Sequence, residues 1–162
     1  MIKTTIALIT LFSFFSFLLK AQDFSLGGGL GYGTQINNLG LNFRGDVKFE
    51  KQWSITPHFN YFFNKTEGAV TYKWNALNID GHYFFELDQL WTFYPLFGIN
   101  FSTVSEKVND ITFSNSDVGI NLGIGSEYNF DRRLSGFGEI KYVVSEADQL
   151  VITLGLLYQI TN

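Results

Sequence analysis

The sequence predicts an all-β fold, an eight-stranded antiparallel up-and-down transmembrane β-barrel with a filled polar interior. Three observations lead to this prediction. Apolar and polar residues alternate with a period of two along eight segments, and tight connections alternate with longer ones between those segments. After residue 22, no apolar stretch reaches the length of a membrane-spanning helix.

The composition limits what the chain can be. Of its 162 residues only 16% are charged and 18% are aromatic, including 18 Phe and 8 Tyr, which excludes a disordered or nucleic-acid-binding chain. The absence of Cys excludes a disulfide scaffold, a thiolate metal site, a cysteine nucleophile and an acylated lipoprotein anchor. The length suits one domain.

The N-terminal segment 1–21 has the features of a secretory signal peptide. Lys3 precedes an apolar run from Ile6 to Leu19, and Ala21 is a small residue before the polar Gln22. The run is short for a spanning helix, which needs about 20 apolar residues. We therefore expect cleavage after Ala21, which leaves 22–162 as the barrel domain, with an uncleaved membrane anchor as the alternative.

The first half of the mature chain contains four predicted strands. In 24–33, apolar residues alternate with serine and glycine, whereas in 39–50 they alternate with polar and charged residues, among them Arg44. The segments 53–64 and 77–86 repeat the pattern with aromatic residues on one side and polar residues on the other. The entry to the fourth strand, 70–76, can be phased either way.

The second half contains four more. Aromatic and aliphatic residues occupy one parity of 91–101 and of 118–130, and in 134–144 they oppose Glu139 and Lys141. In 150–160 the alternation has no break. Each of the eight segments is about as long as a strand that crosses a bilayer at a tilt.

The connections fall into two classes that alternate along the chain. Short turns on one side and longer loops on the other are typical of an outer-membrane barrel, in which the short turns and both termini face the periplasm. The tight connections are 50–52, 86–90 and 131–133, the long ones are 64–73 and 103–116, and the short connections 34–38 and 145–149 lie at the long-loop end.

The period of two does not by itself say which face looks outward. A secreted soluble barrel of the lipocalin type, binding an apolar ligand, would place the apolar parity inside. No charged residue lies on the apolar parity of any predicted strand, which favours contact with lipid. Aromatic residues also gather near the strand ends, as in an aromatic girdle. The expected periplasmic girdle is Phe49, Trp53, Phe85, Trp91, Phe130 and Tyr158.

The polar parity shows size complementarity, as a packed interior requires. Folding neighbouring strands about their turns places Gly29 near Arg44, Gly31 near Asn42, and Gly123 and Gly125 near Lys141 and Glu139. In so narrow a barrel, side chains fill the interior and leave no open pore. We expect a paired interior polar network of Arg44, Asp46, Lys48, Glu50, His58, Asp80, His82, Glu127, Glu139 and Lys141.

Two prolines lie within predicted strands. Pro57 and Pro95 each lack the N–H that a ladder hydrogen bond needs, and a closed barrel has no free edge to place them on. The sequence therefore predicts a bulge or a missing ladder bond at each.

Through these alternating strands, the chain resembles the small eight-stranded outer-membrane barrels typified by OmpA and OmpX, over essentially all of 22–162. The Lys20-Ala21-Gln22 leader end is similar to those of Bacteroidota secreted proteins. The resemblance implies residence in the cell outer membrane, contact with its lipid, and insertion by the barrel-assembly machinery. That machinery reads a last strand ending in an aromatic residue, whereas here Tyr158 precedes Ile160-Thr161-Asn162.

The sequence favours a structural or surface-recognition role over catalysis. An outer-membrane lipid-modifying enzyme is the alternative, but the His-x-Ser spacing of lipid A deacylases is absent around His58 and His82. The two histidines lack the spacing of a metal site, the glycine run 27–33 is followed by no helix, and we expect no cofactor. Any surface ligand would bind at 64–73 or 103–116.

Overall fold

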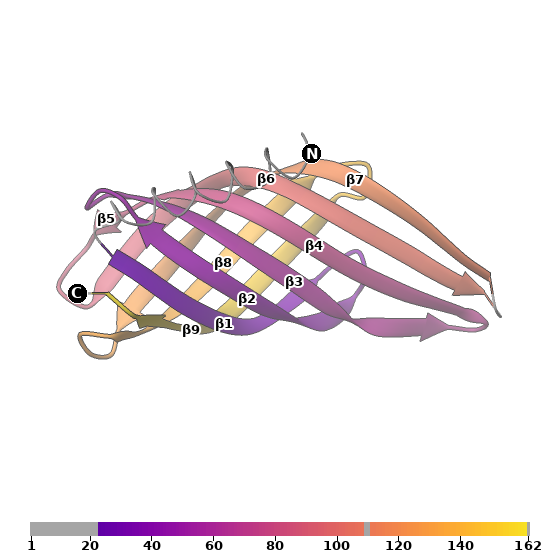
Figure 1. Cartoon of the computed structure of the whole chain (residues 1–162), viewed down its shortest axis with the longest axis horizontal. Coiled ribbons are helices and arrows are strands. Elements are labelled where there is room, and N and C mark those ends of the chain that lie inside the picture. Colours follow the sequence, from indigo (N-terminus) through magenta and orange to yellow (C-terminus); the bar gives the residue numbers. More distant parts are fainter. Residues whose placement is uncertain (1–22, 109–110, 162) are drawn as a thin grey trace, which may run out of the picture.

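The computed structural model describes residues 23–108 and 111–161, so the predicted signal peptide lies outside the described residues. The strands form one antiparallel sheet that closes on itself as an elongated barrel (Figure 1). They are β1 (Asp23–Gly33), β2 (Asn38–Lys48), β3 (Trp53–Glu67), β4 (Val70–Tyr83), β5 (Phe85–Glu86), β6 (Trp91–Val108), β7 (Ile111–Asn129), β8 (Leu134–Val144) and β9 (Gln149–Gln159).

Eight strands form the wall of the barrel, because β5 continues the line of β4 beyond a break at Phe84. Each strand pairs with its neighbours in the chain, and the pairing of β1 with β9 closes the barrel. The predicted eight-stranded up-and-down fold is confirmed. Among the described residues, no helix is long and apolar enough to cross a membrane.

Both prolines coincide with interruptions of the ladder, as predicted. Between β2 and β3 the pairing passes from Arg44↔His58 to Val47↔Ile55, which skips Pro57. Opposite β6 it passes from His82↔Leu96 on β4 to Phe85↔Phe93 on β5, which skips Pro95. The register is the same on both sides of each gap, so each proline removes ladder contacts without creating a bulge.

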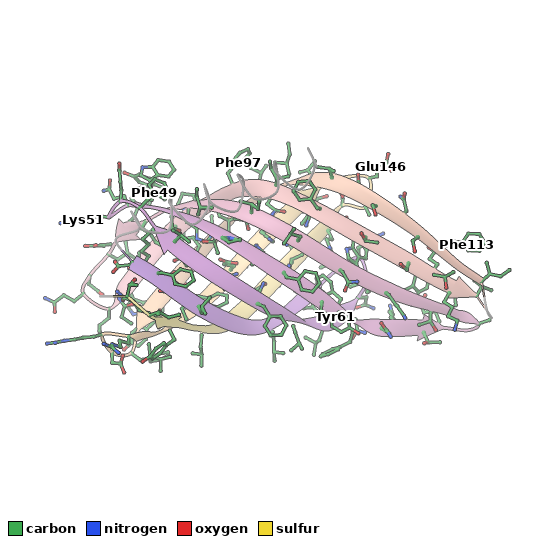
Figure 2. All side chains as sticks on the ribbon, in the orientation of Figure 1. Phe49, Lys51, Tyr61, Phe97, Phe113 and Glu146 are labelled. Atoms are coloured by element: carbon green, nitrogen blue, oxygen red, sulfur yellow. The ribbon has the colours of Figure 1, made fainter. Side chains whose placement is uncertain are left out.

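The apolar parity faces outward and the polar parity faces inward. Phe97 is 61% exposed on the outside of the barrel, whereas Lys141 is 2% exposed inside it. Figure 2 shows Phe97 and Tyr61 pointing away from the wall. Because a barrel in water would place its apolar side chains inside, the soluble lipocalin-like alternative is wrong.

Aromatic side chains line the short-turn end of the outer surface. Of the six predicted girdle residues, five are exposed there and Phe49 is half-buried. Tyr83 joins the ring of Trp53 to that of Phe85, with centroids 4.8 Å apart on each side. Tyr128 likewise contacts Trp91 and Phe130 at 4.8 Å and 5.2 Å. These contacts make short continuous bands of rings, as expected at a membrane interface.

The two predicted long loops are instead extensions of strands, which corrects the prediction for 64–73 and 103–116. The β3–β4 and β6–β7 hairpins project beyond the other strands at one end of the barrel (Figure 1). Polar residues at both sets of alternate positions hid the period of two, but a hairpin that meets water on both faces, as 111–116 does, needs no alternation. Cross-strand hydroxyl pairs support it, such as Ser105 with Ser114 at 2.8 Å and Thr66 with Thr71 at 3.1 Å.

The predicted glycine pairings are correct on one side of the barrel and shifted on the other. Gly123 pairs with Lys141 and Gly125 with Glu139, as expected. Arg44 pairs with Gly27 and Asn42 with Gly29, which differs from the prediction by two residues. The turn spans 34–37 and ends at Asn37, whose φ is 52°, so the hairpin folds one residue earlier than expected.

Candidate functional site

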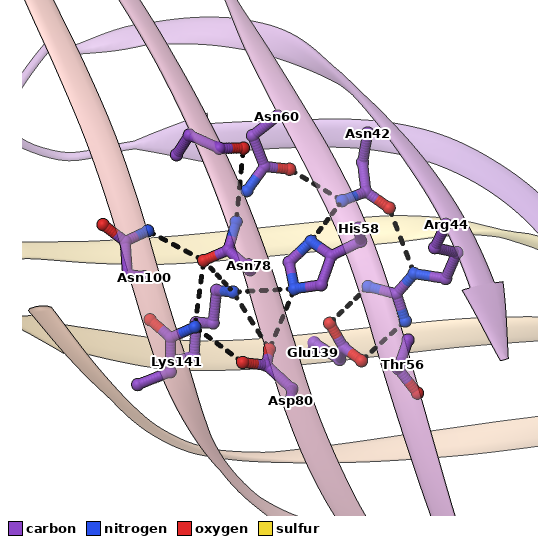
Figure 3. A network of polar contacts seen from close by, with 12 residues as sticks. Asn42, Arg44, Thr56, His58, Asn60, Asn78, Asp80, Asn100, Glu139 and Lys141 are labelled. Carbon is purple, nitrogen blue, oxygen red and sulfur yellow. Dashed lines mark hydrogen bonds and ion pairs between the residues drawn. The ribbon is translucent and has the colours of Figure 1, made fainter. Parts of the chain in front are cut away.

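The centre of the barrel is filled by a network of buried polar side chains that come from most of the strands (Figure 3). Glycines on β7 make room for it. A Cβ added to Gly123 would lie 2.7 Å from Cβ of Lys141, and one on Gly125 would overlap the ring of Tyr94. The large polar side chains of β8 therefore fit only because the neighbouring strand β7 lacks side chains there.

Arg44 and Glu139 form the shortest ion pair of the network. Both guanidinium nitrogens Nη1 and Nη2 donate to the carboxylate, at 2.7 Å and 2.6 Å. The hydroxyl of Tyr94 donates to the same carboxylate at 2.9 Å, and the guanidinium lies 3.8 Å from the ring centre of Phe137. The charges are thus paired, hydrogen-bonded and removed from solvent.

Asp80 is the centre of a second group. Its Oδ2 lies 2.8 Å from Nε2 of His58 and 3.1 Å from Nζ of Lys141, and its Oδ1 accepts from the amide of Asn121 at 2.6 Å. Lys141 also donates to Oδ1 of Asn78 at 3.2 Å. The carboxylate is satisfied on both oxygens by three neighbours from other strands.

Both ring nitrogens of His58 have partners in the network. Its Nδ1 lies 3.0 Å from Nδ2 of Asn42, whose Oδ1 accepts from Nε of Arg44 at 3.1 Å. Its Nε2 lies 2.8 Å from Oδ2 of Asp80 and 3.0 Å from Nζ of Lys141. The imidazole therefore links the group around Arg44 to the group around Asp80.

The remaining predicted interior residues lie nearer the short-turn end. Asp46 accepts from the hydroxyl of Thr56 at 3.0 Å, and His82 stacks on Tyr94 with centroids 4.5 Å apart. Lys48 lies 3.6 Å from the buried Glu127 and is itself half-buried.

Glu50 is the exception to the predicted network. It is exposed in the turn after β2, because β2 ends at Lys48 and the chain reverses before Glu50 can point inward.

Apolar side chains cap the polar layer at both ends, which the sequence analysis missed. Toward the projecting hairpins, Ile36, Phe62, Trp74, Val143 and Val151 form one buried cluster. Toward the short turns, Phe84, Tyr94 and Leu96 form another. The sequence did contain a signal for the strand residues of these clusters. They occupy the same alternate positions as the inward-facing polar residues, whereas outward-facing residues occupy the other alternate positions.

The network has the groups of a catalytic site but not the access. His58 and His82 are 3% and 2% exposed, and both lie inside the wall. Within 23–108 and 111–161, no three His, Asp or Glu side chains are placed to hold a metal ion together. Chemically, the arrangement is a charge-paired filling of the barrel.

The projecting end offers a different surface. There β3, β4, β6 and β7 continue as one sheet, with β4 and β6 paired as far as Val70↔Val108. β8 pairs with β7 only from Ile120 onward, so the β7 segment 111–119 is a sheet edge among the described strands. Ile111 and Phe113 lie exposed near its tip, where Figure 2 shows Phe113.

Comparisons with known proteins agree with this architecture. The family described as "Outer membrane protein beta-barrel domain" matches residues 7–159. Ail, the attachment invasion locus protein of Yersinia pestis, superposes with a TM-score of 0.65 at 15% identity, covering 85% of this chain and 97% of Ail. A sequence comparison with curated proteins finds no match.

Two further solved structures share the fold. The N-terminal β-barrel domain of OprF from Pseudomonas aeruginosa gives a TM-score of 0.69 at 12% identity, covering 86% of this chain and 99% of that one. A major outer membrane protein from Thermus thermophilus gives a TM-score of 0.71 at 13% identity, covering 85% of this chain and 99% of that one.

Proposed function

Because the chain belongs to the outer membrane protein beta-barrel domain family, we propose that this outer-membrane protein serves surface recognition through its projecting sheet and conducts no bulk solute. The observation that carries the proposal is the contrast between the two parts of the barrel. The interior is packed with paired charges and capped by apolar clusters, whereas the sheet continues outward with a free edge.

The free edge is the feature suited to a partner. The unpaired side of this edge presents backbone N–H and C=O groups that an extended peptide can pair with as far as residue 116, while exposed side chains such as Phe113 add apolar contact. Beyond it, Asp117 accepts from the amides of Val118 and Glu146 and covers the edge. Native proteins usually shield such edges, and here the shielding strand β8 stops short. A rigid scaffold that holds an exposed edge away from the membrane favours binding over transport.

One structural neighbour supports this reading by its name and by a complex. Ail is called an attachment invasion locus protein, and it has also been solved with the heparin analogue sucrose octasulfate. At 15% identity the likeness carries the fold and not the ligand. Attachment remains our proposal for this chain, and its partner is expected at the projecting hairpins.

An adhesion assay tests the recognition role. Cells that display the protein are compared with cells that display a shortened variant lacking the register-matched pairs 105–108 and 111–114, on surfaces coated with extracellular-matrix proteins. We expect the full-length protein to raise adhesion above the empty-vector level and the shortened variant to lose that gain. Equal adhesion by both, or no gain from the full-length protein, would contradict the proposal.

Folding controls and conductance complete the test. Both proteins should show the same mobility shift between unheated and boiled samples in detergent electrophoresis, because the trimmed pairs lie outside the barrel walls. Liposomes containing the protein should not swell in small sugars, since the interior is filled. Swelling at the rate of an open porin would refute the closed interior.

Membership of this family also leads to expectations about biogenesis and catalysis. We expect contact with outer-membrane lipid along the apolar parity and insertion by the barrel-assembly machinery, so depletion of that machinery should lower the amount of folded barrel. We propose no catalytic role, because His58 and His82 are turned into the packed interior. An altered lipid A mass in cells that express the protein, lost on His58→Gln, would support the lipid-modifying alternative instead.

A further inference from the structure

A pocket of about 260 Å³ lies at the outer mouth of the barrel. Its walls come from the projecting parts of β3, β4 and β6, and the 34–37 turn contributes Ile36. Trp74, which also belongs to the apolar cluster with Phe62 on the side of the projecting hairpins, is 5% exposed and lines the pocket. The pocket is therefore a hollow resting on the apolar cap, open toward the outside and closed toward the barrel centre.

A β-bulge turns two charged side chains toward this pocket. The β3–β4 ladder shifts between Phe62 and Lys65, so that β3 gains one residue between Phe62↔Trp74 and Lys65↔Tyr72. Without the extra residue, Asn64 would stand opposite Tyr72 and Lys65 would face the other side. Bulges of this kind re-aim side chains next to functional sites. Here the bulge places Lys65 and Glu67 among the lining residues.

The charges in the pocket do not cancel. Nζ of Lys65 lies 2.8 Å from Oε1 of Glu67, so these two form a pair. Glu106, the cross-strand partner of Tyr72, also lines the pocket and takes part in no ion pair with the described residues. One carboxylate is thus left for a ligand, beside the aromatic side chains of Tyr72 and Trp74.

We propose that this pocket binds a small organic amine through its ammonium group. Carboxylate oxygens accept charge-assisted hydrogen bonds from an ammonium group. Aromatic rings attract organic ammonium ions, which hold their water less tightly than metal ions do. The apolar floor suits the hydrocarbon part of an alkyl amine. A metal ion would need several clustered ligands, and the described residues contain no group of three.

The inference deepens the proposed recognition role by naming a ligand class at the outer end, and it rests on that role. It uses side chains of the pocket and none of the backbone groups of the 111–119 edge. The shortened variant of the adhesion assay also lacks Glu106, so Glu106→Gln is the change that separates the two: it should weaken amine binding and keep adhesion through the edge. If adhesion is absent but the amine binds in detergent solution, only the proposed recognition role fails.

Calorimetric titration of the purified barrel in micelles with spermidine tests the proposal. We expect saturable binding to one site that weakens with added salt. Glu106→Gln should weaken it by about tenfold or more, the effect of losing one charge-assisted hydrogen bond. The matched control is Glu146→Gln, an exposed outer-end carboxylate outside the pocket, which should change binding by less than about twofold. Both variants must keep the heat-dependent mobility shift.

Three results would overturn the proposal. The first is the absence of saturable spermidine binding. The second is an equal loss in Glu106→Gln and Glu146→Gln, which would show only general attraction to an acidic surface. The third is preferential binding of glucose or sucrose octasulfate over spermidine, because neither of these ligands carries the positive charge that an unpaired carboxylate favours.

Discussion

Arg44 and Glu139 join two strands that are not neighbours in the sheet. Arg44 belongs to β2 and Glu139 to β8, with β1 and β9 between them, and both oxygens of the carboxylate accept from the guanidinium at 2.6–2.7 Å. The ion pair is therefore a strut across the interior of the barrel, between residues 95 positions apart in the chain.

Removing one end of the strut should strongly destabilise the barrel. Arg44→Met leaves the Glu139 carboxylate buried without its partner, which costs about 3–5 kcal/mol of the free energy of unfolding. Urea titration of the barrel in lipid vesicles measures the loss. Arg132→Met, at an exposed turn, should stay near wild type. The double variant Arg44→Met with Glu139→Met should recover much of the loss, and a double variant as unstable as the sum of both single changes would contradict a paired strut.

Phe97 and Phe113 offer a matched test of where the membrane lies. They are 61% and 62% exposed, but Phe97 lies on the barrel wall and Phe113 on the projecting hairpin (Figure 2). Phe97→Arg should cost about 2–4 kcal/mol of unfolding free energy in vesicles, and Phe113→Arg about 0–1 kcal/mol. Similar costs for the two would mean that the apolar band is misplaced.

Gly125 should not tolerate even a methyl group. Its added Cβ would overlap the Tyr94 ring. That ring cannot move away easily, because it stacks on His82 and its hydroxyl donates to the Glu139 carboxylate. Gly125→Ala should therefore lower the unfolding free energy by about 1–3 kcal/mol. Gly45→Ala is the control, because its Cβ would meet only outer side chains at 3.5 Å or more. A variant Gly125→Ala as stable as Gly45→Ala would show that the interior packing is loose.

Acid should weaken the 86–90 turn through Asp88. The backbone N–H groups of Trp91 and Leu90 donate to its carboxylate at 2.7 Å and 2.8 Å and lower the pKa of Asp88 below its ordinary value. The folded state therefore keeps the carboxylate charged to lower pH than the unfolded state does. Its contribution is complete above the unfolded pKa and is lost as the pH falls through the folded pKa.

Carboxyl NMR titration of Asp88 measures this shift directly. A midpoint at or above that of an unfolded aspartate would contradict it. Asp88→Asn should remove the corresponding part of the acid dependence of stability, while the turn at Asp131, whose carboxylate accepts from Arg133 and Leu134, keeps its own.

The sequence predicted the barrel well because a single rule governs its walls. In β8, Ile140 lies outside and Lys141 inside, as their alternation required, and the β7–β8 register follows from a tight turn of few residues. The projecting hairpins were missed for the converse reason. Where water bathes both faces, cross-strand pairs such as Ser105 with Ser114 stabilise a strand that shows no alternation.

The interior was predicted for its charges and not for its apolar caps. Phe62 and Trp74 occupy inward-facing alternate positions. Aromatic residues are common on both faces of these strands, however, so only the charged and polar residues were assigned to the interior. The mouth pocket could not be found this way either. The bulge between Phe62 and Lys65 reverses the parity of the rest of β3, and no residue type in that segment signals it.

The pairing of β1 with β9 sets an order of events for biogenesis. The amide of Ile160 donates to the carbonyl of Phe24, and the hydroxyl of Thr161 accepts from the amide of Phe24, so the segment after β9 extends this seam along the start of β1. The barrel can therefore close only after β9 has been synthesised. Until then, β1 pairs on one side alone, and its other edge has no partner strand.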